Sequence, residues 1–257
     1  MAPQNGPRVL LVGESWISYA AHLKGFNFFS TAFYEEGLAP LRKAMEGFAE
    51  LTHIPGHLAA TDFPDNLQDL QGYDVVLFSD VGSDTLLLHP DTFLHLKVTP
   101  NRLRLVQEYV ANGGGFAMIG GYLSFGGYEG KAHYHGSPIE EILPVKISPF
   151  DDRVETPEGI QPTIVAGNHT ILAGIEAPWP PLLGYNRVQL KDNAQLLLQH
   201  GPDPMLAVGG YEAGRTAAYA SDISPHWGSE AFVAWSHYAT FWQQLITWLA
   251  RSQKKQL

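Results

Sequence analysis

The sequence predicts an α/β fold in which a mainly parallel sheet is covered by helices on both faces. Two runs, Arg8–Gly13 and Tyr73–Asp80, are mostly apolar without alternation, which is typical of strands buried on both sides. Between them, apolar residues recur at helical spacing over 37–48, and Leu51–Ile54 follows as a second strand. This order of strand, helix and strand indicates crossover units of a parallel sheet.

The second half of the chain is predicted to change character. A helix is expected to have Thr99 as its N-cap and Pro100 at its first position, to end at the glycines 113–115, and to lead into a buried strand, Phe116–Ile119. Beyond Pro144, short segments broken by Pro, Gly and Asp predict a β-rich insertion of hairpins or long loops after about residue 145. A strand and a last helix then complete the sheet, at Arg215–Ala220 and Phe241–Leu249.

The composition sets limits on the class of protein. A chain of 257 residues fits one domain, which we expect to span 1–257. Only 16% of the residues are charged, while 45% are hydrophobic and 12% are aromatic, which favours a homo-oligomer or a large aromatic-lined pocket. The net charge of -10, with no basic cluster beyond Lys254-Lys255, argues against nucleic acid as a partner.

The absence of cysteine excludes disulfides, thiolate metal sites and thiol nucleophiles. The N-terminus lacks the features of a signal peptide, and no stretch approaches the about 18 uninterrupted apolar residues of a membrane span. We therefore expect a cytoplasmic protein with no membrane partner. No motif indicates a cofactor.

A glycine pair at the end of the 116–119 strand predicts a sharp turn. In the G-x-nucleophile-x-G elbow of hydrolases the central residue is presented above the sheet, and Tyr122 holds that position after Gly120 and Gly121. Ser124 lies two residues too late, so a serine hydrolase is not expected. We expect one of the two glycines to have a backbone conformation that is costly for other residues, and the Tyr122 side chain to point into a pocket.

The loop after the last predicted strand carries the second candidate cluster. Asp222 and His226 are close enough in sequence to share one pocket, with Trp227 as an apolar wall. This pattern predicts an acid–base pair. The alternative is a capped loop in which Asp222 accepts hydrogen bonds from backbone amides and the His226 side chain occupies a polar cavity.

Ligands of open α/β sheets bind outside the carboxyl ends of the strands. Five polar or aromatic residues follow the first and third strands there and are predicted to bind a ligand, with helix capping as the alternative role. They are Glu14, Ser15, Trp16, Lys24 and Asp80. Gly121 and Trp227 are expected to belong to the same site.

His133 and His135 would place two imidazoles on one side of an extended segment, as half of a metal site. No acidic third ligand is near them in the sequence, so a metal is not expected. The glycines 113–115 precede a strand and more plausibly end a helix than bind a phosphate.

Several segments together resemble a bacterial family, labelled putative glutamine amidotransferase or putative cytoplasmic protein, within the class I glutamine amidotransferase-like superfamily. They span nearly the whole chain and are Gly13–Trp16, Lys24–Phe26, Tyr34–Gly37, Asn112–Tyr122 and Ser221–Trp227. The resemblance implies a flavodoxin-like sheet. It extends more faintly to the trehalose-utilisation branch of the superfamily, which is associated with sugar chemistry.

The resemblance also implies which catalytic positions are altered. Enzymes of the superfamily use an elbow cysteine with a histidine and a glutamate spaced His-x-Glu, and here these positions are Tyr122, His226 and Gly228. A phenol, with a pKa of about 10, is a poor nucleophile toward a carboxamide. The resemblance therefore concerns the fold and does not imply glutaminase activity.

We expect a pocket at the strand carboxyl ends that binds a small polar, carbohydrate-like ligand between Trp16 and Trp227. If the protein is an enzyme, His226 is the general acid or base, oriented by Asp222, and Tyr122 donates a proton or hydrogen bond. The alternatives are a non-catalytic sensing or assembly protein, and a metal-dependent hydrolase built on His133 and His135.

Overall fold

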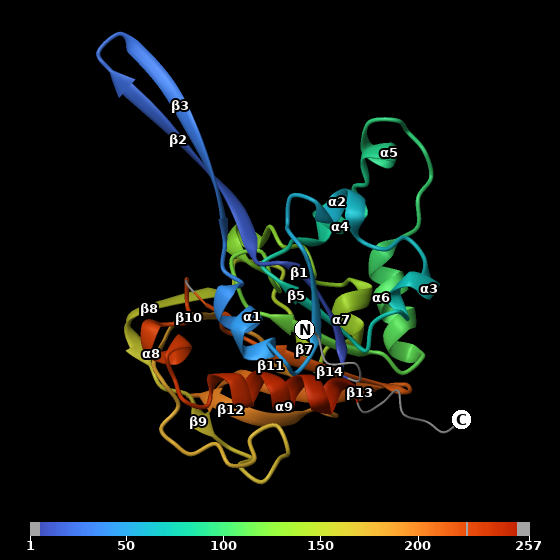
Figure 1. The fold of residues 1–257 in the computed structure, drawn as a ribbon, viewed down its shortest axis with the longest axis vertical. Helices are drawn as coiled ribbons and strands as arrows, with labels where there is room; N and C mark the ends of the chain where they lie inside the picture. Colours follow the sequence, from blue (N-terminus) through green and yellow to red (C-terminus); the bar gives the residue numbers. More distant parts are fainter. Residues whose placement is uncertain (1–5, 225, 251–257) are drawn as a thin grey trace.

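The computed structural model describes residues 6–224 and 226–250, so the Lys254-Lys255 pair and Pro225 lie outside the described part. Its centre is an eight-stranded sheet with the order β4-β1-β5-β6-β14-β13-β12-β9 (Figure 1). The parallel strands are β1 (Arg8–Gly13), β4 (Glu50–Ile54), β5 (Val75–Ser79), β6 (Gly115–Ile119) and β14 (Gly214–Tyr219). Counted along the chain, their order in the sheet is 2-1-3-4-5, which is the flavodoxin-like order.

The β-rich region expected after about residue 145 is confirmed. Antiparallel strands extend the sheet on the β14 side, namely β13 (Asp203–Tyr211), β12 (Gln195–His200) and β9 (Thr163–Ile164). Small two-stranded sheets pair β10 (Leu182–Asn186) with β8 (Arg153–Ile160), and β11 (Gln189–Leu190) with β7 (Val145–Lys146). Strands β13, β12 and β9 thus enlarge the central sheet on one side, whereas the two small sheets are separate from it.

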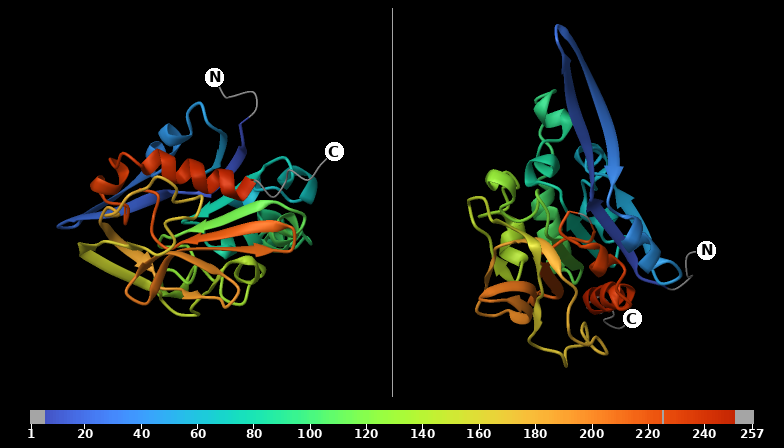
Figure 2. Two further views of the ribbon diagram at one scale, coloured as in Figure 1. Left: turned by 90° about the horizontal axis from the view of Figure 1, so that it is seen from below. Right: turned by 90° about the vertical axis from the view of Figure 1, so that its left-hand side faces the viewer.

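Helices cover both faces of the sheet (Figures 1 and 2). One layer holds α1 (Ala39–Met45) and α9 (Tyr238–Ala250), which pack on each other and on the parallel strands. The other layer holds α2 (Ala59–Asp62), α3 (Leu67–Leu70), α4 (Ser83–Leu87), α6 (Arg102–Ala111) and α7 (Pro138–Ile142). Shorter elements are α5 (Pro90–Phe93), η1 (Tyr128–Gly130) and α8 (Glu230–Val233).

Continuous apolar strands and apolar helix faces make the core. Every residue of β5 and β6 is buried, as the unbroken apolar pattern predicts for a sheet covered on both sides. On α9, Phe241, Trp242, Leu245, Ile246 and Leu249 are buried against the sheet. Among the described residues, none of the helices has the length and apolar character needed to cross a bilayer.

Two local predictions were wrong. Helix α6 begins at Arg102, two residues later than expected, because the Asn101 side chain accepts a hydrogen bond from the Arg104 amide and so caps the helix in place of Thr99. The predicted ligand-binding residues after Glu14 do not all stay at the carboxyl end of the first strand. Ser15–Lys24 (β2) and Asn27–Glu36 (β3) pair as a long antiparallel hairpin, which projects from the body of the molecule (Figure 1).

Candidate functional site

The site is built where strand order reverses, between β1 and β5. At such a switch point the loops leave the sheet in opposite directions and open a crevice at the carboxyl ends of the strands. Glu14 follows β1 and Asp80 follows β5, and both have a positive φ, of 50° and 51°. Residues with a Cβ rarely adopt this conformation, and strained backbone of this kind clusters at functional sites. Both predicted carboxylates thus stand at the switch point.

Glu14 is a buried carboxyl group with two hydroxyl partners. Only 1% of its surface is exposed, and it accepts hydrogen bonds from the hydroxyls of Ser79 at 2.5 Å and Ser224 at 3.4 Å. Burial raises its pKa to about 7, and the negative charge of Asp80 acts in the same direction, while the two hydroxyls oppose the rise. A buried carboxyl group whose pKa is raised in this way is a common feature of sites for proton transfer.

Asp80 ties the end of β5 to the turn after β6. Its Oδ1 accepts a hydrogen bond from the Leu123 amide at 2.6 Å, and its own amide donates to the Ser124 hydroxyl at 3.0 Å. Burial raises the pKa of Asp80, although the amide donors and the nearby His226 oppose that rise. The proximity of His226 brings the predicted histidine to the switch point.

The glycine pair after β6 has the geometry predicted for it. Gly121 has a φ of 156°, and its amide donates to Asn186 Oδ1 at 3.0 Å. A Cβ on Gly120 would lie 2.2 Å from the carbonyl oxygen of Ala220 on the neighbouring chain segment. Unlike a hydrolase elbow, the turn leads to η1 and not into a long helix, because Asp152 accepts the amides of Gly126 and Gly127 and holds the chain in turns.

The Tyr122 side chain lies in a cluster of aromatic rings, and its predicted orientation into a ligand pocket stays a prediction. Its ring is half-buried and stacks on the His226 imidazole, with centroids 5.2 Å apart and an interplanar angle of 15°. Trp16 lies on His226 at 5.0 Å, and Trp227 meets Tyr122 edge-on at 5.6 Å. Three predicted site segments, distant in sequence, therefore meet in one ring cluster made of Trp16, Tyr122, His226 and Trp227.

Asp222 holds the loop that carries His226. Its carboxylate is buried and accepts hydrogen bonds from the amides of Ile223 at 2.7 Å and His226 at 3.4 Å. Burial raises its pKa well above the ordinary value, and the charges of Glu14 and Asp80 add to the effect. Within the described residues, no hydrogen bond joins this carboxylate to the imidazole ring, which is exposed. Asp222 therefore positions His226 through the backbone, as in the capped-loop alternative.

Trp227 is placed differently from the expectation. Its indole is 1% exposed and donates from Nε1 to Glu155 Oε2 at 3.0 Å, so it is not free to stack on a ligand. Gly184 makes room for this ring, since a Cβ there would lie 2.3 Å from Nε1. The buried Trp227 ring packs against Tyr122 within the ring cluster.

Two residues of β8, Arg153 and Glu155, contact the ring cluster and were not predicted from the sequence. The Arg153 guanidinium lies over the rings of Tyr122 at 5.1 Å and Tyr128 at 3.9 Å, and Asp151 binds it through two hydrogen bonds. Burial raises the pKa of Tyr122, and the Glu155 carboxylate adds to the rise. These contacts could not be predicted from the sequence around Asp151, because they depend on how the strands of the β-rich region pair.

A cavity of about 450 Å³ lies at the base of the hairpin beside this cluster. Its walls are aromatic and acidic and include Trp16, Glu35, Glu36, Ser224, Gly228 and Glu230. Glu14 lies directly behind the wall, because a Cβ on Gly37 would be 2.2 Å from its Oε1 and Ser224 donates to the same oxygen. The Trp16 indole is fixed by a hydrogen bond of 2.9 Å to Glu35. The Ser15 hydroxyl instead accepts the Gly56 amide at 2.8 Å and holds a neighbouring loop.

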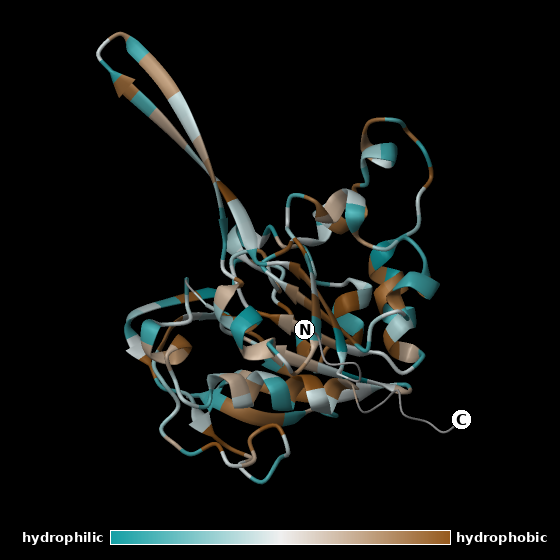
Figure 3. Ribbon diagram, in the orientation of Figure 1, coloured by the Kyte–Doolittle hydropathy of each residue, from teal (hydrophilic) through white to brown (hydrophobic). Residues whose placement is uncertain are grey.

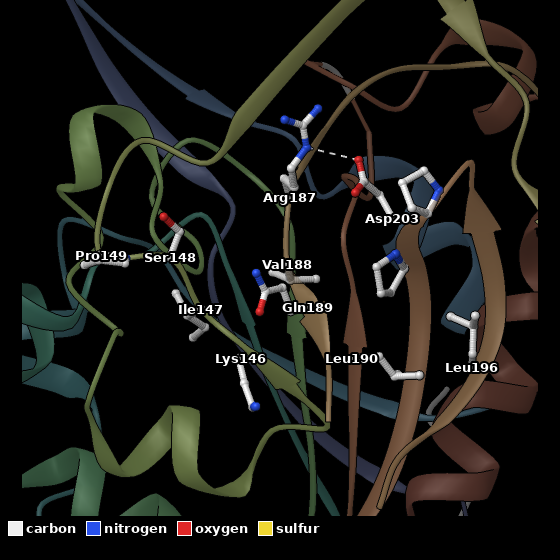
Figure 4. Close-up of a pocket in the computed structure, with 12 residues that line it drawn as sticks. Lys146, Ile147, Ser148, Pro149, Arg187, Val188, Gln189, Leu190, Leu196 and Asp203 are labelled. Carbon is white, nitrogen blue, oxygen red and sulfur yellow. Dashed lines mark hydrogen bonds and ion pairs between the residues drawn. The ribbon is translucent and has the colours of Figure 1, made fainter. Parts of the chain in front are cut away.

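A larger cavity, of about 660 Å³, lies on the β-rich side (Figure 4). Lys146, Ser148, Arg187 and Asp203 are among its lining residues. The Asp203 carboxylate already accepts hydrogen bonds from Arg187 at 3.0 Å and from the Tyr185 hydroxyl at 2.7 Å. None of the predicted site residues lines this cavity, so we assign the candidate site to the smaller one.

The remaining predicted residues lie elsewhere. Lys24 is at the far end of β2, where its Nζ is 5.7 Å from the Phe29 ring, so a single chain does not bring it to the strand ends. His133 contacts Asp84 at 3.0 Å, whereas His135 contacts the Ile147 carbonyl at 2.7 Å. The two imidazoles are thus bonded to different partners, and no group of three His, Asp or Glu residues in the described part could hold a metal ion.

Comparison with known proteins agrees with this topology. Two cytoplasmic proteins of Salmonella typhimurium share the structure over 94% of this chain: STM3548, with 42% identity, 98% of its own length covered and a TM-score of 0.91, and STM1381 of strain LT2, with 43%, 99% and 0.90. No curated protein matches the chain. The family described as "Putative glutamine amidotransferase" matches residues 8–251, and the chain therefore belongs to that family, with Tyr122 where its resemblance to the active enzymes would place a cysteine.

Proposed function

We propose that this protein binds a small, polar, uncharged ligand of carbohydrate-like chemistry at the hairpin base and transfers a proton to or from it. The observation that carries the proposal is the carboxyl group of Glu14, which has a pKa raised to about 7 behind an aromatic and acidic cavity at the switch point. A protonated carboxyl group at neutral pH is a common feature of sites for proton transfer.

The lining of the cavity supports a polyhydroxylated ligand. An aromatic face such as that of Trp16 packs on the apolar side of a sugar ring, while carboxylates such as Glu35 and Glu36 accept hydrogen bonds from its hydroxyls. Because these carboxylates and Glu230 line the cavity, a phosphate or carboxylate ligand would be repelled. The acidic wall thus favours a neutral ligand.

His226 and Tyr122 are the residues we assign to the chemistry. The imidazole is exposed, lies near the Asp80 carboxylate and stacks on the phenol, so it can exchange a proton with a ligand held against Trp16. Tyr122 supplies a hydroxyl donor but no thiolate, so the reaction class is a hydrolysis, lyase or isomerase step and not glutamine hydrolysis.

The second candidate function is non-catalytic sensing. It is favoured by Asp222, whose carboxylate accepts hydrogen bonds from backbone amides and not from the imidazole that it was expected to orient. Both candidates predict ligand binding, and only the first predicts turnover. The relatives are named as cytoplasmic proteins, and we place this chain in the same compartment.

A thermal-shift panel tests the proposal. Neutral monosaccharides and polyols should raise the melting temperature of the wild-type protein by mass action, and sugar phosphates should not. Trp16→Ala should abolish the shift, whereas Phe150→Ala, which removes an exposed ring elsewhere, should keep it. A panel in which only anionic compounds stabilise the protein would contradict the proposal. With a binding compound in hand, His226→Gln should keep binding and lose turnover if the protein is an enzyme.

A further inference from the structure

One face of the β2–β3 hairpin exposes apolar side chains to solvent. In its register Ile17 pairs with Tyr34 and Leu23 with Phe28, and directly opposed residues point to the same side. Tyr19 lies between these pairs on the same side, and small residues, Ala21, Ser30 and Ala32, fill the remaining positions. Ile17, Tyr19, Leu23, Phe28 and Tyr34 are all exposed. We call this side the apolar face. Its one charged residue is Glu36, which pairs with Ser15 at the base of the hairpin and accepts a hydrogen bond from the Tyr34 hydroxyl.

The opposite face of the hairpin is different, because its side chains contact one another. The Trp16 indole and the Ser18 hydroxyl both donate to Glu35, each at 2.9 Å. His22 stacks on Phe29 with centroids 4.5 Å apart and contacts the Thr31 hydroxyl. This face also exposes Phe29 and Phe33, but its polar side chains bind one another, so it is the more polar of the two sides.

A second exposed apolar segment lies at the same end of the molecule. The loop around α5 exposes Leu88, Phe93, Leu94, Leu96 and Val98, of which Leu96 and Val98 are almost fully exposed. Both the hairpin and this loop rise beyond the sheet on the same side, and both contain strongly hydrophobic stretches (Figures 1, 2 and 3). Each projection exposes apolar side chains that a single chain leaves uncovered, and Figure 1 shows the two projections apart from each other.

The extent of this surface matches a stable interface. A fully covered aromatic side chain buries about 150–250 Å², so the large side chains of the two projections, about half exposed or more, offer on the order of 1,000 Å². A stable interface needs about 800 Å² from each partner. In addition, an isolated two-stranded hairpin is marginally stable in water. A surface rich in exposed aromatic and aliphatic side chains is typical of a permanent interface between copies of one chain.

We propose that the apolar face of the hairpin and the α5 loop dock onto a second copy of this chain. The charge favours a second copy over a membrane: the chain carries a net charge of -10, and Lys24 is the only Lys or Arg of the hairpin. Surfaces that enter anionic bilayers are rich in basic residues. Contacts between two acidic copies must be apolar, and this face supplies them.

Light scattering on the full chain, without added ligand, tests the proposal. The wild-type mass should be a multiple of 28.3 kDa. Tyr19→Lys combined with Phe28→Lys should reduce the mass to that of one chain. The matched control, Ala20→Lys with Phe33→Lys, adds the same charge to the opposite face and should leave the mass unchanged. Circular dichroism should show the same folded spectrum for both variants, because all four side chains lie on the projecting hairpin.

Single cysteines provide a second measurement, because the chain has none of its own. Ala21→Cys on the apolar face should form a disulfide-linked dimer under mild oxidation, whereas Ala20→Cys on the opposite face should remain a single chain. A wild-type protein that stays at 28.3 kDa over a hundredfold range of concentration would overturn the proposal. Sedimentation of such a monomer with phosphatidylglycerol vesicles would also overturn it, and would assign the apolar face to a lipid surface.

Discussion

The carboxyl edge of the sheet and the β2–β3 hairpin both depart from the usual pattern, in which charged groups are exposed and large apolar side chains are buried. At the sheet edge, Glu14 and Asp222 are buried carboxylates. On the hairpin, Tyr19 and Phe28 are large apolar side chains in solvent. Burying a carboxyl group and exposing an aromatic ring both cost free energy. The two regions meet at Trp16, the first side chain of the hairpin that lines the cavity.

The two regions offset this cost in different ways. The sheet edge is satisfied from within, because serine hydroxyls and backbone amides bind each carboxylate. Among the described residues the apolar face of the hairpin has few such partners, the Tyr34 hydroxyl donating to Glu36, and most of its large side chains remain exposed. A candidate ligand site can therefore be identified from groups that meet within one chain. A candidate interface is identified from the apolar side chains that one chain leaves exposed.

The largest expected effect contrasts glycines of the two regions. Gly120→Ala should destabilise the fold by about 3 kcal/mol, because the new Cβ would meet a backbone carbonyl that cannot move without breaking the sheet. Gly121→Ala should cost about 1 kcal/mol or more through its φ of 156°. Gly25→Ala, at the hairpin tip with φ 62° and nothing within 4 Å, should cost only the backbone strain of about 1 kcal/mol. Urea unfolding measures all three.

Equal losses at Gly120 and Gly25 would show that the sheet edge is no more rigid than the hairpin. That result would remove the contrast between a packed region and an uncovered one.

Much of the sheet could be predicted from the sequence, because a buried parallel strand leaves an unbroken apolar run. The predicted Arg8–Gly13 strand coincides with β1, and the others differ by one or two residues at their ends. The hairpin could not be found in this way. Its residues alternate between two faces that both expose apolar side chains, so no clear hydrophobic period marks them. Its turn, Lys24-Gly25-Phe26, lacks the Asn-Gly or Asp-Gly pair that is typical of hairpins.

The site could be predicted only in part. Glu14, Asp80 and Tyr122 were found because strand ends and glycine turns are visible in the sequence. Arg153 and Glu155 were missed because they reach Tyr122 and Trp227 through the pairing of β8 with β10, which no local pattern encodes. Spacing alone could not decide which partner Asp222 binds, because a carboxylate four residues before a histidine can accept a hydrogen bond from either its ring or its amide.

The next effect tests the buried carboxyl group through pH. Because burial raises the pKa of Glu14 from its ordinary 4.5 to about 7, the folded state keeps this proton to higher pH than the unfolded chain does. The unfolding free energy should therefore fall as the pH rises through this window. Glu14→Gln stays neutral, so its stability relative to wild type should rise between pH 5 and pH 8 by up to about 3 kcal/mol. Chemical denaturation at several pH values measures the difference.

The comparison residue is Glu35 on the hairpin, which is exposed to solvent. Glu35→Gln keeps the size of the side chain and serves as the matched surface substitution. A relative stability of Glu14→Gln that does not change with pH would mean that Glu14 is ionised throughout, and the proton-transfer proposal would lose its basis.

A smaller effect is expected at Tyr122. Its ring stacks on His226 and lies under Arg153, and Tyr122→Phe keeps both contacts. We therefore expect the unfolding free energy to change by less than about 1 kcal/mol, whereas the affinity for a ligand found in the thermal-shift panel should fall. Isothermal titration and urea unfolding separate the two quantities. A loss of stability without a loss of affinity would place the hydroxyl in the scaffold and not in the site.

The smallest expected effect is the absence of glutaminase activity, in wild type and after Tyr122→Cys. The substitution restores a thiol at the turn, yet a nucleophilic cysteine also needs a histidine that a carboxylate keeps basic. The position two residues after His226 is Gly228, where a Cβ would already lie 2.9 Å from the Ser224 carbonyl oxygen, so the backbone leaves no space for a glutamate. Asp222 binds amides instead of the ring. Ammonia release from glutamine by Tyr122→Cys, above a heat-treated control, would show that Asp80 can serve as that carboxylate, and the sheet edge would then hold a complete catalytic set that lacks only its nucleophile.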